Sequence, residues 1–206
     1  GPGRPARVAV RGEGHLRLRA SADRSVVGSD GAARGRWWGA GRVAGVSDET
    51  RPVRLGFLYP GYAAEADYPL MASRLDPSPV VQVVHTSVGE DAHRVDALLD
   101  LGGPDRLAEG AAELDRPDVV LWACTSGSFV FGLDGARRQV APLAEQLGVP
   151  ASSTSFAFVE AIRALGVERV AVAATYPADV TDAFASFLAE AGLTVVATGA
   201  EDIITA

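Results

Sequence analysis

Short apolar runs alternate with amphipathic stretches along the chain from residue 53 onward. The apolar runs predict strands at residues 53–59, 80–85, 119–123, 149–152, 170–174 and 193–198. The stretches between them predict helices at residues 91–101, 105–114, 135–147, 156–165 and 177–191. Strands that alternate with helices are typical of βαβ units, so the pattern predicts an α/β protein built on parallel sheets.

The ends of several predicted helices carry signals of their own. Gly148, Gly166 and Gly192 each follow a helix at the position that favours a left-handed residue. Hydroxyl side chains at residues 152–155 precede the helix at 156–165, and we expect them to cap its first amides. These signals support the boundaries that the apolar pattern predicts.

Residues 1–45 lack this pattern and differ in charge. They are rich in Gly, Arg, Ala and Ser and carry a net charge of +6, whereas the rest of the chain carries −13. A basic arm that stacks Trp37 and Trp38 on nucleic acid is one interpretation. We favour a disordered or non-native segment, because the composition offers no apolar face to pack, and we expect no nucleic-acid partner.

The chain is therefore predicted to have three parts. Residues 1–45 are the basic arm, residues 46–150 a first α/β domain, and residues 151–206 the start of a second α/β domain. The second α/β part has only two clear strands, at residues 170–174 and 193–198. A two-stranded parallel unit falls short of the usual sheet size, so this domain is expected to be incomplete.

The candidate chemistry lies just after the strands, because ligands of open parallel sheets bind at the carboxyl ends of strands. The segment 124–128 combines one thiol, several hydroxyls and a glycine. Its backbone N–H groups and hydroxyls can hold a carboxylate without a basic side chain. The same donors lower the pKa of Cys124, whereas apolar burial raises it, so Cys124 is either a reagent or a small buried hydrophobe.

The composition excludes several other classes of protein. No apolar run approaches the roughly 18 residues that span a bilayer, and no secretory leader opens the chain, so we expect a cytoplasmic protein without a membrane partner. Glycines 39, 41 and 45 have neither the spacing nor the preceding strand of a dinucleotide fingerprint. A single cysteine makes no cysteine zinc site, and His85 and His93 are taken as loop or surface residues. We expect no cofactor and no metal ion.

Residues 119–206 resemble the maleate cis-trans isomerase and arylmalonate decarboxylase branch of the Asp/Glu racemase superfamily. The likeness lies in Ala-Cys-Thr-Ser at 123–126, in the run at 161–176 and in Asp-Val-Thr-Asp at 179–182, and it extends weakly to residue 53. The resemblance implies two similar Rossmann-like parallel-sheet domains with the active site between them. It also implies a second catalytic cysteine beyond residue 206, so the chain is expected to be truncated in the second domain.

The resemblance assigns roles to individual residues. Cys124 occupies the first of two catalytic cysteine positions, where decarboxylases of this branch have glycine. Thr125 and Ser126 fall where the family binds the substrate carboxylate or stabilises an enolate-like intermediate. Tyr176 matches the tyrosine at the strand end of the second domain. The loop after the first strand supplies two further substrate-binding candidates, Tyr59 and Pro60.

The function implied is a cofactor-independent, cysteine-dependent isomerase of a small carboxylate or dicarboxylate, resembling maleate cis-trans isomerase. An Asp/Glu-type racemase, an arylmalonate decarboxylase-like enzyme and an inactive carboxylate-binding fragment are the alternatives. The oligomeric state stays open, with a homo-oligomer as one outcome.

Overall fold

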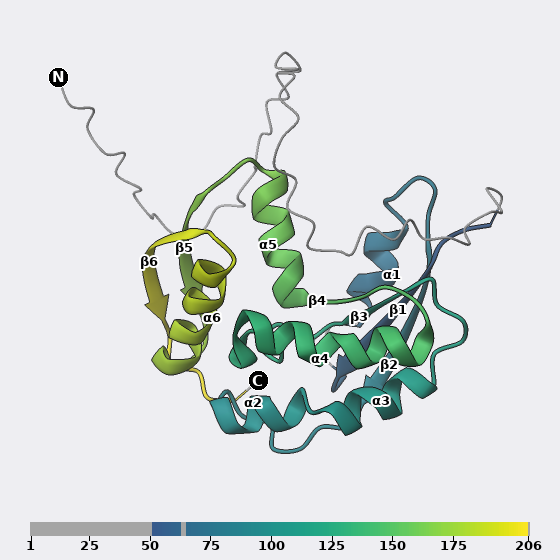
Figure 1. The fold of residues 1–206 in the computed structure, drawn as a ribbon, viewed down its shortest axis with the longest axis horizontal. Coiled ribbons are helices and arrows are strands. Elements are labelled where there is room, and N and C mark those ends of the chain that lie inside the picture. Colours follow the sequence, from purple (N-terminus) through teal and green to yellow (C-terminus); the bar gives the residue numbers. More distant parts are fainter. Residues whose placement is uncertain (1–50, 63–64, 206) are drawn as a thin grey trace, which may run out of the picture. The chain divides into compact units, whose positions relative to one another are not determined.

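The computed structural model describes residues 51–62 and 65–205, and these belong to one compact unit (Figure 1). The predictions for residues 1–45 lie outside the described residues. Within the described part of the chain, no helix has the length and apolar character needed to cross a membrane.

The first sheet has four parallel strands in the order β2-β1-β3-β4. The strands are β1 (Arg54–Pro60), β2 (Val80–Thr86), β3 (Val119–Trp122) and β4 (Ala151–Ser153). All four were predicted within a few residues from apolar runs. Because β4 pairs with β3, the first sheet extends past the domain boundary expected at residue 150.

Helices pack on both faces of β1. On one face, α3 (Pro104–Ala112) packs against β1, β2 and α4 (Gly132–Leu147). On the other face, Tyr68 of α1 (Asp67–Ala72) stacks on Phe57, with ring centroids 4.4 Å apart. Leu58, Val120 and Trp122 are fully buried in the core beneath α3 and α4. The two interior strands, β1 and β3, are thus held by neighbours on both edges and by apolar contacts.

The second sheet consists of β5 (Arg169–Ala174) and β6 (Thr194–Ala200), which are parallel. The helix α5 (Thr154–Ala164) leads into it, and α6 (Ala178–Glu190) connects its strands. A second core gathers around Phe187 and Leu188 of α6. Leu101 at the end of α2 (Val95–Leu101) packs against both cores.

The structure confirms some of the predictions made for the helix ends and contradicts one. Gly148, Gly166 and Gly192 have φ values of 67°, 66° and 87°, which confirms the predicted left-handed ends. The predicted hydroxyl cap of α5 is wrong, because Ser153 at the N-cap makes no capping hydrogen bond with its side chain. The hydroxyl of Ser155 instead accepts the backbone N–H of Phe129, with 3.0 Å between the two atoms. That hydroxyl therefore ties α5 to the segment that follows β3.

Candidate active site

The candidate site begins where β3 ends. Trp122 pairs with Leu58 of β1 on one side and with Ser153 of β4 on the other. The backbone N–H of Ala123 still donates to the Leu58 carbonyl, at 2.7 Å, before the chain leaves the sheet. Residues 124–128 then form a loop that leads into the short 3-10 helix at Phe129–Phe131. The sheet thus places this loop at the carboxyl ends of its interior strands.

The thiol of Cys124 lies inside this loop and is only 6% exposed. Its Sγ accepts the backbone N–H of Gly127 at 3.2 Å, and the hydroxyl of Ser126 lies 3.9 Å from it. Burial raises the pKa of the Cys124 thiol, while hydrogen bonds from Gly127 and Ser126 act in the opposite direction. Burial outweighs the hydrogen bonds, so the thiol is protonated at neutral pH in this structure.

A cavity of about 300 Å³ lies over the end of β3. All the residues that were predicted to act in catalysis or substrate binding line this cavity: Tyr59, Pro60, Cys124, Thr125, Ser126 and Tyr176. They come from the ends of three strands, β1, β3 and β5. The structure therefore brings all six side chains to one small space, and their chemical roles stay a prediction.

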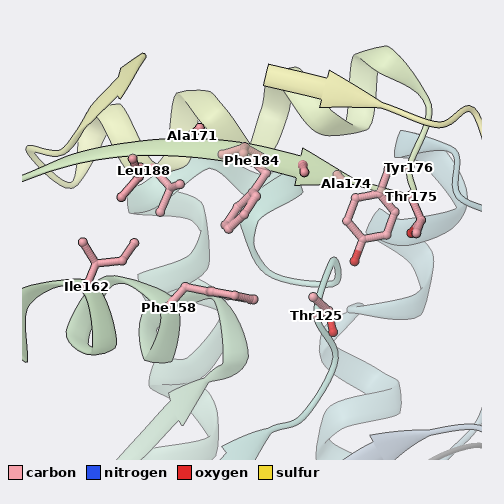
Figure 2. A pocket seen from close by; sticks show the side chains of 12 residues that line it. Thr125, Phe158, Ile162, Ala171, Ala174, Thr175, Tyr176, Phe184 and Leu188 are labelled. Carbon is pink, nitrogen blue, oxygen red and sulfur yellow. The ribbon is translucent and has the colours of Figure 1, made fainter. Parts of the chain in front are cut away.

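Tyr176 closes one side of the cavity. Figure 2 shows its hydroxyl pointing toward Thr125. Burial raises the pKa of Tyr176 and ionised Cys124 raises it further, while hydrogen bonds with the side chains of Ser126 and Thr125 lower it. The phenol therefore stays protonated and can donate a hydrogen bond to an anion in the cavity.

His93 also lines the cavity, although it was predicted to be a loop or surface residue. Its ring meets that of Tyr176 edge to face, with centroids 4.8 Å apart. Its backbone N–H donates to the Ile204 carbonyl at 2.6 Å, and its Nδ1 lies 3.0 Å from the Ile203 carbonyl. His93 thus joins the loop after β2 to the segment after β6. No pattern in the sequence signals this contact, because the residues that it joins are far apart along the chain.

Tyr68 is a second neighbour of the site that sequence reasoning missed. Its hydroxyl lies 3.5 Å from the carbonyl of Ala123, next to the thiol. Burial raises the pKa of Tyr68 to about 12, and the charges of Tyr59 and Cys124 contribute to the shift. Tyr68 lies on α1, a six-residue helix that the sequence did not predict because the segment is too short to show helical periodicity.

The cavity offers neutral donors more than positive charge. Among the described residues that line it, none is arginine, while Glu90 and Asp91 bring acidic groups to its wall. Glu90 is engaged by Arg94, whose Nη1 lies 2.7 Å from a carboxylate oxygen of Glu90. A carboxylate bound in the cavity would thus depend on hydroxyl and amide groups.

A second cavity, of about 420 Å³, runs along β5 (Figure 2). Its walls are largely apolar, and the rings of Phe158 of α5 and Phe184 of α6 meet there, with centroids 5.2 Å apart. One edge of β5 pairs with β6, and no strand of the described part of the chain pairs with the other edge. Thr125 and Tyr176 line both cavities, so the apolar groove meets the thiol cavity at these two side chains.

Potential metal ligands do not cluster in the described residues: no group of three or more His, Cys, Asp or Glu side chains is placed to hold an ion. The acidic residues at positions 91, 96, 100 and 105 accordingly do not form such a group.

The sequence model of the arylmalonate decarboxylase family matches residues 103–205, which is half of the chain. The chain belongs to the arylmalonate decarboxylase family. This finding confirms the branch that the resemblance in the sequence indicated. The matched segment contains the elements from α3 to β6, continues to residue 205, and includes the Cys124 loop and Tyr176.

Other members and structural relatives agree with this assignment. Arylmalonate decarboxylase of Bordetella bronchiseptica is 40% identical over 75 residues, which cover 36% of this chain and 31% of that protein. A cysteine-to-serine mutant of Nocardia farcinica maleate cis-trans isomerase, with a covalently bound succinylcysteine intermediate, has a TM-score of 0.65 at 24% identity. A liganded arylmalonate decarboxylase mutant, with one glycine changed to cysteine and one cysteine to serine, has a TM-score of 0.61 at 26% identity.

The chain spans less than two thirds of the length of these relatives. The matches cover 75% of this chain and 66% of the isomerase, and 75% of this chain and 64% of the decarboxylase mutant. The fold is thus shared with both enzymes over most of the described residues.

Proposed function

We propose that this chain supplies the nucleophilic cysteine of a cofactor-free isomerase for a small carboxylate, with maleate cis-trans isomerisation as the favoured reaction. The observation that carries the proposal is the position of Cys124, at the end of an interior strand in a cavity lined by hydroxyl groups. The covalent succinylcysteine in the N. farcinica relative supports it, because that species is what a cysteine forms by adding to maleate.

The chemistry requires one thiolate and no oxidant or reductant. The sulfur forms a C–S bond to one alkene carbon while the π electrons move onto the other carbon and its carboxylate, as an enediolate. The central bond is then single and can rotate. When the C–S bond breaks, the electron pair returns to form the trans double bond and the thiolate is regenerated. Thr125, Ser126 and Tyr176 are the residues we propose to bind the carboxylate and stabilise the enediolate.

The protonation state of Cys124 sets a condition on this reaction. Because burial raises the thiol pKa, the attacking thiolate is scarce at neutral pH and becomes more abundant as pH rises. The Gly127 N–H and the Ser126 hydroxyl are the groups that favour the thiolate. We therefore expect activity to increase as the pH rises above the pKa of an ordinary free thiol.

Two alternatives have specific support. A decarboxylase is supported by the family match and by 40% identity to the B. bronchiseptica enzyme, but the resemblance implies glycine where Cys124 stands. Carboxylate binding without turnover is supported by the raised pKa of the thiol. A racemase of the Asp/Glu type would use two thiols to remove and return an α-proton on opposite faces of the substrate.

We also propose that the two sheets belong to two α/β domains of a cytoplasmic protein, with the site between them. The support is that each sheet has its own core and that the cavity takes Tyr59 from one and Tyr176 from the other. The pairing of β4 with β3 supports a boundary after Ser153.

The test compares the chain with its Cys124→Ser variant. We expect maleate conversion to fumarate to fall by roughly three orders of magnitude or more, because a hydroxyl is a far weaker nucleophile than a thiolate. Aspartate and glutamate racemisation and arylmalonate decarboxylation are assayed in parallel, to separate the alternatives. A thermal melt and a maleate titration on the same samples check the fold and binding. Maleate turnover that survives the substitution would show that Cys124 is not the nucleophile.

A further inference from the structure

Gln139 is a polar residue at the edge of the buried face of α4. That face is formed by Leu133, Ala136, Val140 and Leu143, which are all buried. Gln139 lies one helical turn from Ala136 and from Leu143, and it is half-buried. A polar side chain in this position must find partners inside the protein.

The carboxamide of Gln139 finds three partners, and two belong to the Cys124 loop. Its Nε2 donates to the carbonyl of Gly127 at 2.6 Å and to the carbonyl of Gly102 at 2.9 Å. Its Oε1 accepts the hydroxyl of Ser128 at 2.6 Å. Since two carbonyls can only accept, they fix which end of the amide faces them. Both N–H groups and the oxygen are thus engaged.

The space around this amide is tight. A Cβ on Gly102 would clash with the Nε2 atom of Gln139 and with the carbonyl oxygen of Gly127. A Cβ on Gly127 would lie 2.9 Å from the sulfur of Cys124. The amide, the loop and the thiol therefore occupy one closely packed region.

The link to the thiol runs through Gly127. Its backbone N–H donates to the Cys124 sulfur at 3.2 Å, while its carbonyl on the next peptide plane is held by Gln139. The two planes meet at a glycine Cα, which has the widest choice of φ and ψ of any residue. Fixing one plane from outside restricts the rotation that would move the other N–H off the sulfur.

We infer that Gln139 is a positioning residue that keeps the Gly127 N–H directed at the Cys124 sulfur and so favours the thiolate. The inference deepens the proposed function, on which it rests for its catalytic meaning. Gln139 does not touch the thiol, and its effect passes through the loop. A hydrogen bond to an anionic acceptor is stronger than one to a neutral acceptor, so holding this donor in place favours the ionised form.

The experiment measures the rate of Cys124 alkylation by iodoacetamide against pH. Cys124 is the only cysteine of the chain, so the reaction reports on this thiol alone. The variant is Gln139→Met, which keeps the length of the side chain and removes all three hydrogen bonds. The matched control is Gln146→Met on the same helix, whose Nε2 donates only to the Ala108 carbonyl, at 3.1 Å. The midpoint of the profile reports thiol acidity, whereas greater exposure of the sulfur raises the rate at every pH.

We expect the midpoint to move to higher pH in Gln139→Met, so that the rate at neutral pH, relative to the plateau, falls roughly threefold to tenfold. Gln146→Met should keep the midpoint of the parent chain. Gln139→Glu, which keeps the size and loses both donors, should shift the midpoint in the same direction and serves if the first variant fails to fold.

An unshifted midpoint in either folded variant would overturn the inference, even if the melting temperature falls. Loss of folding in both variants would make Gln139 a structural residue and overturn it as well. The assay contains no substrate, so a shifted midpoint stands whether or not maleate is turned over.

Discussion

The strands of the two sheets differ in how they are paired and how far they are buried. In the first sheet, β1 is paired on both edges, and its central residues Gly56, Phe57 and Leu58 are buried. In the second sheet, β6 is exposed along most of its length and β5 is paired on one edge within the described residues. The first sheet therefore provides a rigid frame for a loop at its carboxyl end, while the second provides a hydroxyl from Tyr176.

This difference explains why the site combines a buried thiol, held by the first sheet, with a more exposed wall from the second sheet. Apart from exposed Thr125, the loop after β3 is buried because the strands on both sides of it are buried, and the thiol pKa rises for the same reason. Hydrogen bonds to the sulfur have to offset that burial. The second sheet adds no further donor to the sulfur itself, so the reactivity of the thiol depends on the first sheet.

The largest effect that tests this comparison is on stability. Val120 in β3 is fully buried and Val196 in β6 is 49% exposed. We expect Val120→Ala to lower the free energy of unfolding by about 2–3 kcal/mol, from lost burial and the cavity left behind. Val196→Ala should change it by less than about 0.5 kcal/mol. Urea denaturation of both variants provides the measurement, and equal losses would contradict the contrast between the sheets.

Much of this frame could be predicted from the sequence, because buried parallel strands are continuous apolar runs. The runs at 80–85 and 119–123 became β2 and β3 almost unchanged. The helix α1 was missed because its six residues are too few for a period to show. Of the hydroxyls expected to cap α5, that of Ser155 instead accepts the backbone N–H of Phe129, a contact that depends on long-range packing.

The site was predictable where it follows strand ends and unpredictable where it depends on distant segments. Cys124 and Thr125 were found because they follow an apolar run, Tyr176 was assigned by the family resemblance, and the structure brings the three together. His93 was set aside because a lone histidine carries no spacing signal. Gln139 was overlooked for the same reason, since only the folded loop brings Gly127 to its side chain.

A smaller effect tests the part of the site that the second sheet supplies. Tyr176→Phe removes the hydroxyl and keeps the ring that packs beside His93 and Phe129. We expect maleate affinity to fall about tenfold, the range for a lost hydrogen bond to a charged group, with an unchanged melting temperature. The control is Ser73→Ala, which removes an exposed hydroxyl that donates to the Leu70 carbonyl and does not line the cavity. Calorimetric titration with maleate gives both affinities, and equal losses in the two variants would remove Tyr176 from the binding site.

The smallest effect concerns the stability that the buried thiol contributes to the fold and that is lost at alkaline pH. Burial raises the pKa of Cys124 in the folded chain, so the folded state keeps the proton longer than the unfolded state does. The stability due to the neutral thiol is therefore complete below the pKa of the unfolded thiol, about 8.5, and is lost as pH rises through the folded value. One group can change the free energy of unfolding by at most about 1.4 kcal/mol per pH unit.

Tyr68 and Tyr176 have raised pKa values too, so they weaken the fold in the same direction at still higher pH. Comparing the chain with Cys124→Ala removes most of their contribution, because both proteins contain both tyrosines. We expect the stability difference between the two proteins, measured by urea denaturation from pH 7 to pH 10, to shift in favour of Cys124→Ala above about pH 8.5. Parallel curves would mean that the folded and unfolded thiols have the same acidity. In that case, hydrogen bonds from Gly127 and Ser126 would fully offset burial, and the thiolate would be available nearer to neutral pH.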